Sequence, residues 1–549
     1  TTFRNWPASL NIECQRCGYN LDTPSSSDVH PPSDAVVALS QNNAVPSSII
    51  AQSCRNNLSG LADSISKIDK NIGRLEDTLR LLQAERNRLL GYTQTYKQVV
   101  HPIRRVPAAI LGETFLACVG DPTDLGHFTI WKKPYQHNSL DKNEPWWRLG
   151  QVCQRWREVA LSHSNLWSYI AIDLPKPGNL PSDAMVSQLI LQLQRSRSQP
   201  LTIALRSATK RPRSDYHSIL TAICVHSSRW ESIRLEFGVN SIEMLRTMSR
   251  LVRGNIPALS RLYLDLSRCP TDAHNNGLDA FALAPRLKTI TVRGLNLTPF
   301  MNLVSLPWSQ ITQFRYRCSS PETTSNLDFI VRMPHIETFV DQRCFGADLN
   351  GHGTINVPSL RLLSLYNDYP QSRLSTFSKL LDRLSVDHLQ DLRIIVSPGI
   401  PSLQCFLRRT APTVRSLSIY NKGLDTAQMI ELLNCASGDL QSLSLRNGSS
   451  DLIAALGSLD PETQKPKLLP KLHTIRIFQP WASSQTQDDS LVNMVECRLS
   501  PDTTAAISLL ELDSEFDIEV ETLEVLKTYR YRGLEVKRSP MLHFLIPGY

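Results

Sequence analysis

The chain has 549 residues, of which 41% are hydrophobic and 20% charged, and a formal net charge of +8 at pH 7. This apolar content can fill a sizeable core and excludes wholesale disorder. No run approaches the ~18 consecutive apolar residues of a membrane span. The 12 cysteines are scattered singly, which excludes a disulfide scaffold and predicts free thiols. No secretory signal is visible, so we expect a cytoplasmic or nuclear protein.

Residues 1–57 are expected to form a disordered N-terminal arm. They are rich in serine, proline and asparagine and lack a sustained apolar period, so they bury too little surface to offset the entropy of ordering. Cys14 and Cys17 form a C-x-x-C pair in this arm. Because a structural zinc needs four ligands, two free thiols are favoured over a metal site. We expect no metal and no cofactor.

Residues 58–100 show a heptad pattern. Apolar residues alternate at steps of three and four, with Arg86 as the one break, and they are Leu58, Leu61, Ile65, Ile68, Ile72, Leu75, Leu79, Leu82 and Leu89. This repeat predicts a long helix with one narrow apolar stripe that must be buried. Two alternatives follow. The helix forms a coiled coil with another chain, identical or different, or it folds back on its own protein.

Residues 101–170 predict a small helical module. A first helix is expected to begin near Pro107. One face of this helix is predicted to hold Ile110, Leu111, Phe115 and Val119. A polar insertion covers residues 120–145, and a second stripe at helical spacing comprises Leu149, Val152, Cys153, Trp156 and Ala160. The pair Leu166–Trp167 closes the module.

This order of a proline, Ile-Leu, a Phe, Leu-x-x-Val-Cys-x-x-Trp-Arg and a final Leu-Trp resembles an F-box. With the preceding heptad helix and the segment HPIRRVP, it is similar to the F-box proteins abundant in mushroom-forming fungi, although Ala109 stands where that family usually has an acidic residue. The resemblance implies docking onto the linker subunit of a cullin–RING ubiquitin ligase. The implied surface comprises Pro107, Ile110, Leu111, Val152, Cys153 and Trp156. Read from the residues alone, the same side chains could form the core of a helical bundle.

Beyond residue 170 the sequence repeats. Ten segments fit the pattern apolar-x-x-apolar-x-apolar, with a mean spacing of about 27 residues, and begin at Trp230, Leu259, Leu287, Ile311, Ile336, Leu360, Leu389, Val414, Leu440 and Leu472. Asp341 occupies the one slot that is not apolar. The pattern is similar to the core of leucine-rich repeats, and it predicts an α/β solenoid, or horseshoe, over residues 171–549. Residues 201–205 and 509–512 are expected to be its first and last strands.

The strand period predicts which side chains face the concave side of the solenoid. Seven of the twenty positions are arginine and two, Glu236 and Asp265, are acidic. We expect a binding surface made of Arg234, Tyr263, Arg293, Arg315, Arg317, Tyr366, Arg393, Tyr420, Arg446 and Arg476. Arginine and tyrosine favour protein interfaces, and clustered arginine suits carboxylate or phosphate. An acidic or phosphorylated protein partner is favoured over a plain solvated face, and nucleic acid is the weakest alternative.

No nucleotide-binding, serine-hydrolase or zinc-protease motif occurs in the sequence. We therefore expect a protein that is not an enzyme. With the resemblance, the first hypothesis is the substrate-recognition adaptor of an SCF-type (cullin–RING) ubiquitin ligase. In this hypothesis the F-box binds the linker subunit and the repeats bind a protein substrate. The alternatives are a scaffold with a degenerate F-box and a nucleic-acid-binding solenoid.

Overall fold

The computed structural model describes most of the chain, and its residues fall into two compact units. One unit ends at Pro107 and the other begins at Ala108. The described residues are 31–42, 44–119, 138–174, 183–207, 216–236, 242–267, 278–294, 297–318, 327–342, 353–366, 374–396, 401–436, 439–462, 465–478, 485–499, 506–513 and 518–539. No helix within these ranges has both the length and the apolar composition needed to cross a membrane.

The first unit contains α1 (Asp34–Asn42), the 53-residue helix α2 (Ser48–Val100) and η1 (Pro102–Arg104). The Ser47 side chain caps α2 by accepting a hydrogen bond from the Ile50 amide. Both α1 and the start of α2 lie in the arm predicted to be disordered, so that prediction is wrong for these residues. Ala51 and Cys54 continue the steps of the heptad pattern upstream of Leu58, but their side chains are too small to stand out in the sequence.

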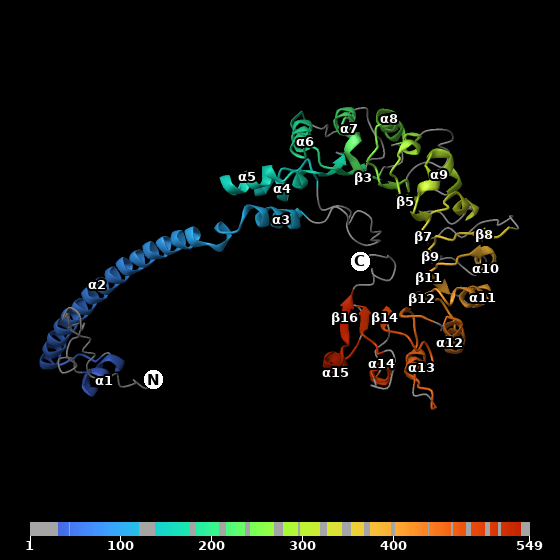
Figure 1. Cartoon of the computed structure of the whole chain (residues 1–549). Helices are drawn as coiled ribbons and strands as arrows, with labels where there is room; N and C mark the ends of the chain where they lie inside the picture. The colour runs from blue at the N-terminus through green and yellow to red at the C-terminus, as the bar shows by residue number, and fades with distance from the viewer. Residues whose placement is uncertain are drawn as a thin grey trace. The chain divides into compact units, whose positions relative to one another are not determined.

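The second unit contains a parallel sheet of 14 strands, and it is a mixed α/β, solenoid-like structure (Figure 1). Each strand hydrogen-bonds to its neighbours along the chain. The strands are β1 (Tyr169–Leu174), β2 (Leu201–Ser207), β3 (Trp230–Glu236), β4 (Arg261–Asp265), β5 (Thr289–Gly294), β6 (Gln313–Cys318), β7 (Thr338–Gln342), β9 (Leu362–Tyr366), β11 (Asp391–Val396), β12 (Ser416–Asn421), β13 (Ser442–Arg446), β14 (Thr474–Phe478), β15 (Leu509–Asp513) and β16 (Glu535–Ser539). A separate pair joins β8 (Ile355–Asn356) to β10 (Leu384–Ser385).

Helices lie on the outer side of the curved sheet (Figure 1). The α-helices of this unit are α3 (Ala108–Val119), α4 (Pro145–Leu149), α5 (Gln154–Ser162), α6 (Asp183–Arg195), α7 (His217–Cys224), α8 (Ile242–Val252), α9 (Leu297–Leu303), α10 (Leu374–Arg383), α11 (Pro401–Thr410), α12 (Thr426–Cys435), α13 (Ser450–Gly457), α14 (Gln485–Arg498) and α15 (Val520–Thr528). Short 3₁₀ turns are η3 (Ser164–Trp167), η5 (Ser227–Arg229), η6 (Ala280–Leu283), η7 (Trp308–Gln310), η8 (Leu327–Arg332) and η10 (Tyr529–Arg532). One apolar core runs from Leu140 to Leu534.

The spacing of the repeat pattern has a clear structural cause. The first apolar residue of every one of the ten segments is at most 1% exposed. In the nine segments from Leu259 to Leu472, the carbonyl of the residue after it accepts two backbone N–H groups from the start of the next strand, at distances of 2.7–3.2 Å. The accepting residues are Ser260, Lys288, Thr312, Glu337, Arg361, Gln390, Arg415, Gln441 and His473. Each repeat is therefore fixed to the next in the same register.

The sheet extends further at both ends than the sequence predicts. All ten repeat segments contain a strand of the sheet, but the first strand is β1 rather than the expected β2, and the last is β16 rather than β15. β1 and β2 pair along six residues, from Tyr169–Thr202 to Leu174–Ser207. The terminal strands lack the full repeat pattern because a strand at the end of a stack has a repeat on one side only.

The helical module packs directly against the first strand of the sheet. The Ser139 amide donates to the Ala171 carbonyl at 2.6 Å, and the Ser139 hydroxyl accepts from the Ala171 amide at 3.1 Å. The Arg195 guanidinium lies 5.1 Å from the Trp147 ring and 4.5 Å from the Trp167 ring. The module thus covers the N-terminal end of the core, and it belongs to the same compact unit as the repeats.

Arg498 connects three segments near the C-terminal end of the sheet. It is fully buried, and its guanidinium donates to the carbonyls of Leu456 (2.8 Å), Leu468 (2.6 Å) and Leu469 (3.2 Å). Leu469 has a left-handed φ of 54°, a conformation that costs about 1 kcal/mol or more in a non-glycine residue. Burial lowers the pKa of Arg498 to about 10. Hydrogen bonds to the carbonyls offset the cost of burying this cation.

We expect Arg498→Met to destabilise this end of the sheet by about 2–4 kcal/mol, because buried carbonyls lose their donor. Urea unfolding, with hydrogen exchange of α13 and α14, measures the effect. Arg408→Met is the control, because Arg408 is exposed. Equal stability of the two variants would contradict a structural role for Arg498.

Candidate functional site

The helical module separates the residues of the expected docking surface into core and exposed groups. Leu111, Phe115 and Val119 on α3 are 2%, 1% and 5% exposed, so they form the core of the module. The Trp156 ring on α5 is half-buried, with its centroid 4.9 Å from that of Phe115. Leu111 is therefore unavailable to a partner in this fold, and Trp156 presents only part of its ring.

The remaining residues of the expected surface face solvent. Ile110 is 57% exposed and Val152 is 61% exposed. Cys153 and Pro107 are exposed as well. Since α3 packs against α4 and α5, the module is assembled without burying Ile110 or Val152.

The second predicted stripe is not a single helix. α4 ends at Leu149 with Gly150 as its C-cap, and α5 begins after Cys153, whose extended backbone (φ −160°, ψ 171°) forms the N-cap. Val152 and Cys153 thus lie in the connection between two helices. The helical spacing in the sequence was misleading here. Trp146 on α4 is 1% exposed, and the indole N–H of Trp167 in η3 donates to the Ala160 carbonyl on α5 at 2.8 Å, so the two helices are held by different contacts.

On the repeat units, strand register aligns the predicted concave positions into rows on one face of the sheet, which we call the polar sheet face. The first row runs through Ala171, Ala204, Arg234, Tyr263, Thr291, Arg315, Val340, Ser364, Arg393, Ser418, Ser444, Arg476, Glu511 and Lys537. The second includes Asp173, Arg206, Glu236, Asp265, Arg293, Arg317, Gln342 and Tyr366, followed by Ile395, Tyr420, Arg446 and Phe478. All ten predicted binding residues lie in these rows, although only the backbone of Tyr366 is described.

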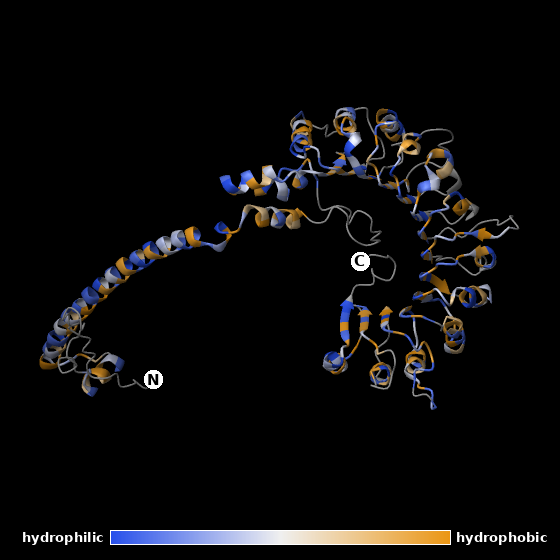
Figure 2. Ribbon diagram, in the orientation of Figure 1, coloured by the Kyte–Doolittle hydropathy of each residue, from blue (hydrophilic) through white to orange (hydrophobic). Residues whose placement is uncertain are grey.

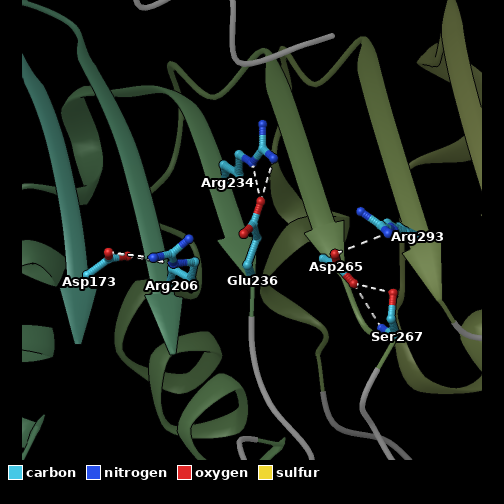
Figure 3. Close-up of polar contacts among 7 residues, drawn as sticks. All are labelled: Asp173, Arg206, Arg234, Glu236, Asp265, Ser267 and Arg293. Atoms are coloured by element: carbon cyan, nitrogen blue, oxygen red, sulfur yellow. Dashed lines mark hydrogen bonds and ion pairs between the residues drawn. The ribbon is translucent and has the colours of Figure 1, made fainter. Parts of the chain in front are cut away.

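Many arginines of the polar sheet face are already paired with carboxylates of the same chain. Figure 3 shows Arg206 with Asp173, Arg234 with Glu236, and Arg293 with Asp265 across β1 to β5. The Arg206–Asp173 contact is 2.6 Å and the Arg293–Asp265 contact 3.7 Å. These pairs reduce the cationic character expected from the sequence.

Two further ion pairs lie nearer the C-terminal end of the sheet. Arg393 contacts Asp391 at 2.8 Å, and Arg476 contacts Glu511 at 2.8 Å. The sequence analysis missed Asp173, Arg206, Asp391 and Glu511 as members of this face. Asp391 lies two residues before Arg393 in the same strand, and Arg206 and Glu511 follow the alternation of the expected strands 201–205 and 509–512, so the sequence contained a signal for these three. Asp173 lies on β1, which the sequence did not predict.

The positive excess is concentrated on the middle strands β6 to β13. Their polar face carries four arginines, Arg315, Arg317, Arg393 and Arg446, and one carboxylate, Asp391. Burial lowers the pKa of Arg315, and the positive charge of Arg393 lowers it further. Arg315 on β6 and Arg393 on β11 lie in the same row, and an anion bound along this row would be attracted by both cations.

An aromatic and apolar patch lies beside these cations. The Arg446 guanidinium lies 4.2 Å from the Tyr420 ring centroid, and the Lys422 ammonium lies 5.4 Å from it. Ile395, Phe478 and Tyr420 form a small apolar cluster on the same row. The combination of stacked arginine and tyrosine is typical of protein interfaces.

The described residues contain no group of three or more histidine, cysteine or acidic side chains able to hold a metal ion. Cys14 and Cys17 lie outside the described residues, as do residues 120–137 of the predicted insertion. A comparison with protein-family models finds no match to this sequence, and a comparison with curated proteins finds none either.

Leu111 is buried in the core of the module and the adjacent Ile110 is exposed, so charged substitutions at the two positions should differ in their effect on stability. We expect Leu111→Asp to destabilise α3 by at least about 3 kcal/mol, because it buries a charge in the core. Ile110→Asp should change stability by about 0.5 kcal/mol or less. Hydrogen exchange of the amides of residues 108–119 measures both. Equal protection in the two variants would contradict this assignment of core and surface.

Proposed function

We propose that this protein is a non-catalytic substrate adaptor of a cullin–RING ubiquitin ligase. Its F-box-like module would bind the linker subunit, and its leucine-rich repeats would bind a protein substrate in the cytosol or nucleus. Such an adaptor forms no bond itself. It raises the effective concentration of the substrate near a charged ubiquitin-conjugating enzyme.

The observation that carries this proposal is the exposure of Ile110, Val152 and Cys153 on a module whose core is complete without them. These are residues through which the F-box resemblance implies linker binding. Apolar side chains that fold stability does not require are available to a partner, and their burial would contribute to affinity.

The polar sheet face supports a substrate with an acidic or phosphorylated segment. Among the described residues, the polar sheet face of the middle strands carries more cations than carboxylates, and Arg315 and Arg393 lie there in one row. A carboxylate or phosphate bound along this row would be attracted by both cations, and the Arg446–Tyr420 stack would add contact area. The paired carboxylates on the flanking strands oppose a long polyanion, so nucleic acid fits this face less well.

One observation favours the alternative of a scaffold with a degenerate F-box. The stacking of Arg195 on Trp147 and Trp167 makes the module the N-terminal cap of the repeats. A cap is required for the stability of a repeat array, so the module has a structural role whether or not it binds a linker subunit.

The linker interaction is tested with the exposed residues. We expect Ile110→Asp combined with Val152→Asp to reduce co-purification with the linker subunit at least about tenfold, because charges replace apolar contacts at the interface. The fold should remain, since both side chains are exposed. Leu283→Asp is the matched control, because Leu283 is 54% exposed and lies on η6 among the repeats. A folded wild-type protein that never binds the linker subunit would refute the ligase assignment.

Substrate recognition is tested with peptide libraries centred on phosphoserine or on serine. We expect the phosphorylated library to bind more tightly, and Arg315→Gln with Arg446→Gln to weaken its binding about tenfold or more, because charge-assisted hydrogen bonds are lost. Arg250→Gln with Arg253→Gln is the charge-matched control, since these side chains are 74% and 61% exposed, on α8 and directly after it. Equal binding of the two libraries would contradict the acidic-partner assignment.

A further inference from the structure

The apolar stripe of α2 is exposed to solvent in the described part of the first unit. We define the heptad stripe as the nine residues Leu58, Leu61, Ile65, Ile68, Ile72, Leu75, Leu79, Leu82 and Leu89. They are between 36% and 65% exposed, and no residue of α2 is buried. Figure 2 shows apolar residues spaced regularly among polar ones along this helix. A helix with such a stripe gains stability by burying it.

The period of the heptad stripe restricts what can cover it. A strict 3.5-residue repeat drifts on a straight helix and faces one partner only if two helices supercoil around each other. The occupant must therefore be another long helix with the same repeat. The next longest helix in the described part of this chain, α14, has 14 residues, against 53 in α2. A second copy of the chain supplies a helix of equal length.

We propose that α2 forms a parallel, in-register, two-stranded coiled coil with α2 of a second copy of this chain. In this arrangement Leu58, Ile65, Ile72, Leu79 and Arg86 occupy a positions, and Leu61, Ile68, Leu75, Leu82 and Leu89 occupy d positions. Isoleucine at two of the a positions, with leucine at four of the five d positions, favours two strands. The inference is independent of the proposed function, because it needs neither a linker subunit nor a substrate.

The charges next to the heptad stripe favour a parallel pair. Arg86 would face the same arginine of the second copy, which is unfavourable alone. However, Glu85, directly before Arg86, occupies a g position. In a parallel pair, each Arg86 reaches Glu85 of the other helix, and both arginines are neutralised. Glu85 now contacts Arg88 at 2.7 Å, and because both side chains are largely exposed this contact is readily exchanged.

An antiparallel pair would be opposed by the acidic residues at e positions, Asp69 and Glu76. In antiparallel coiled coils, e positions face e positions. The registers that keep most of the heptad stripe paired bring Asp69 or Glu76 of one helix against Asp69 or Glu76 of the other. In the parallel pair, by contrast, these acids face Ser64 and Asn71 at g positions. Like charges therefore select the parallel orientation.

The buried area is sufficient for a stable pair. Eighteen apolar side chains from two helices, each about half exposed, would remove roughly 1,000 Å² from water, which reaches the size of specific protein interfaces. The pair would hold two repeat arrays and two helical modules in one particle. A partner with two acidic segments would then bind with an increased effective concentration.

The oligomeric state of the purified full chain tests this proposal. We expect light scattering after size exclusion to give the mass of a dimer at micromolar concentration. Ile72→Asp with Leu75→Asp should give a monomer, because two charges enter adjacent layers of the stripe. Leu81→Asp is the matched control and should remain a dimer, since Leu81 is 73% exposed and occupies a c position away from the stripe. A wild-type monomer at tens of micromolar overturns the proposal.

A second variant guards against loss of folding. We expect Arg86→Leu to tighten self-association by about tenfold or more, because an apolar side chain replaces a charged group that loses hydration at an a position. This gain cannot arise from misfolding. An unchanged dissociation constant would place Arg86 outside the interface and overturn the register.

Cys54 tests the orientation. It lies four residues before Leu58, at a d position that extends the heptad stripe upstream. The two Cys54 thiols therefore meet in a parallel pair and lie at opposite ends of an antiparallel one. Under oxidised glutathione we expect a covalent dimer that disappears with Cys54→Ser. The absence of a dimer that depends on Cys54 overturns the parallel register. These experiments use the purified chain without the linker subunit. A failure of the coiled-coil proposal can therefore be told apart from a failure of the proposed function.

Discussion

The structure of the second unit depends on one recurring backbone interaction. The carbonyl that follows the first apolar residue of a repeat accepts two N–H groups from the next strand, and this contact recurs from Ser260 to His473. It fixes the rise from one repeat to the next, because the buried residue before it can sit at only one depth in the core. The register of the parallel strands from β4 to β15 follows from this constraint. So does the alignment of side chains into rows on the polar sheet face.

The same stacking requirement shapes the helical module. An array of repeats exposes its core at each end unless another element covers it. The module covers the first strand through Ser139, and its Trp147 and Trp167 rings pack against Arg195 of α6. Its own core uses Leu111 and Phe115, which leaves Ile110 and Val152 at the surface. A single small module can therefore stabilise the repeats and still present apolar side chains to a partner.

The net charge of the polar sheet face depends on which arginines lie beside carboxylates in the folded sheet. Counted along the predicted positions, arginine dominates. In the sheet, Arg234, Arg293, Arg393 and Arg476 each lie beside a carboxylate. Two of these carboxylates come from a neighbouring strand, and such pairs become visible only when the register is known. On the described middle strands the polar sheet face carries four arginines and one carboxylate, a much smaller surface than a basic stripe along the whole array.

The sequence by itself determined the repeat, its ten central strands and the heptad helix, because each depends on a local period of apolar residues that burial enforces. It could not locate β1 and β16, since terminal strands stack on one side only and keep less of the pattern. It also could not show that Val152 and Cys153 lie between two helices, because the break between α4 and α5 depends on how each of them packs against α3. Only the tertiary structure decided which side chains of the module are core and which arginines are paired. Both depend on neighbours brought together from separate parts of the chain.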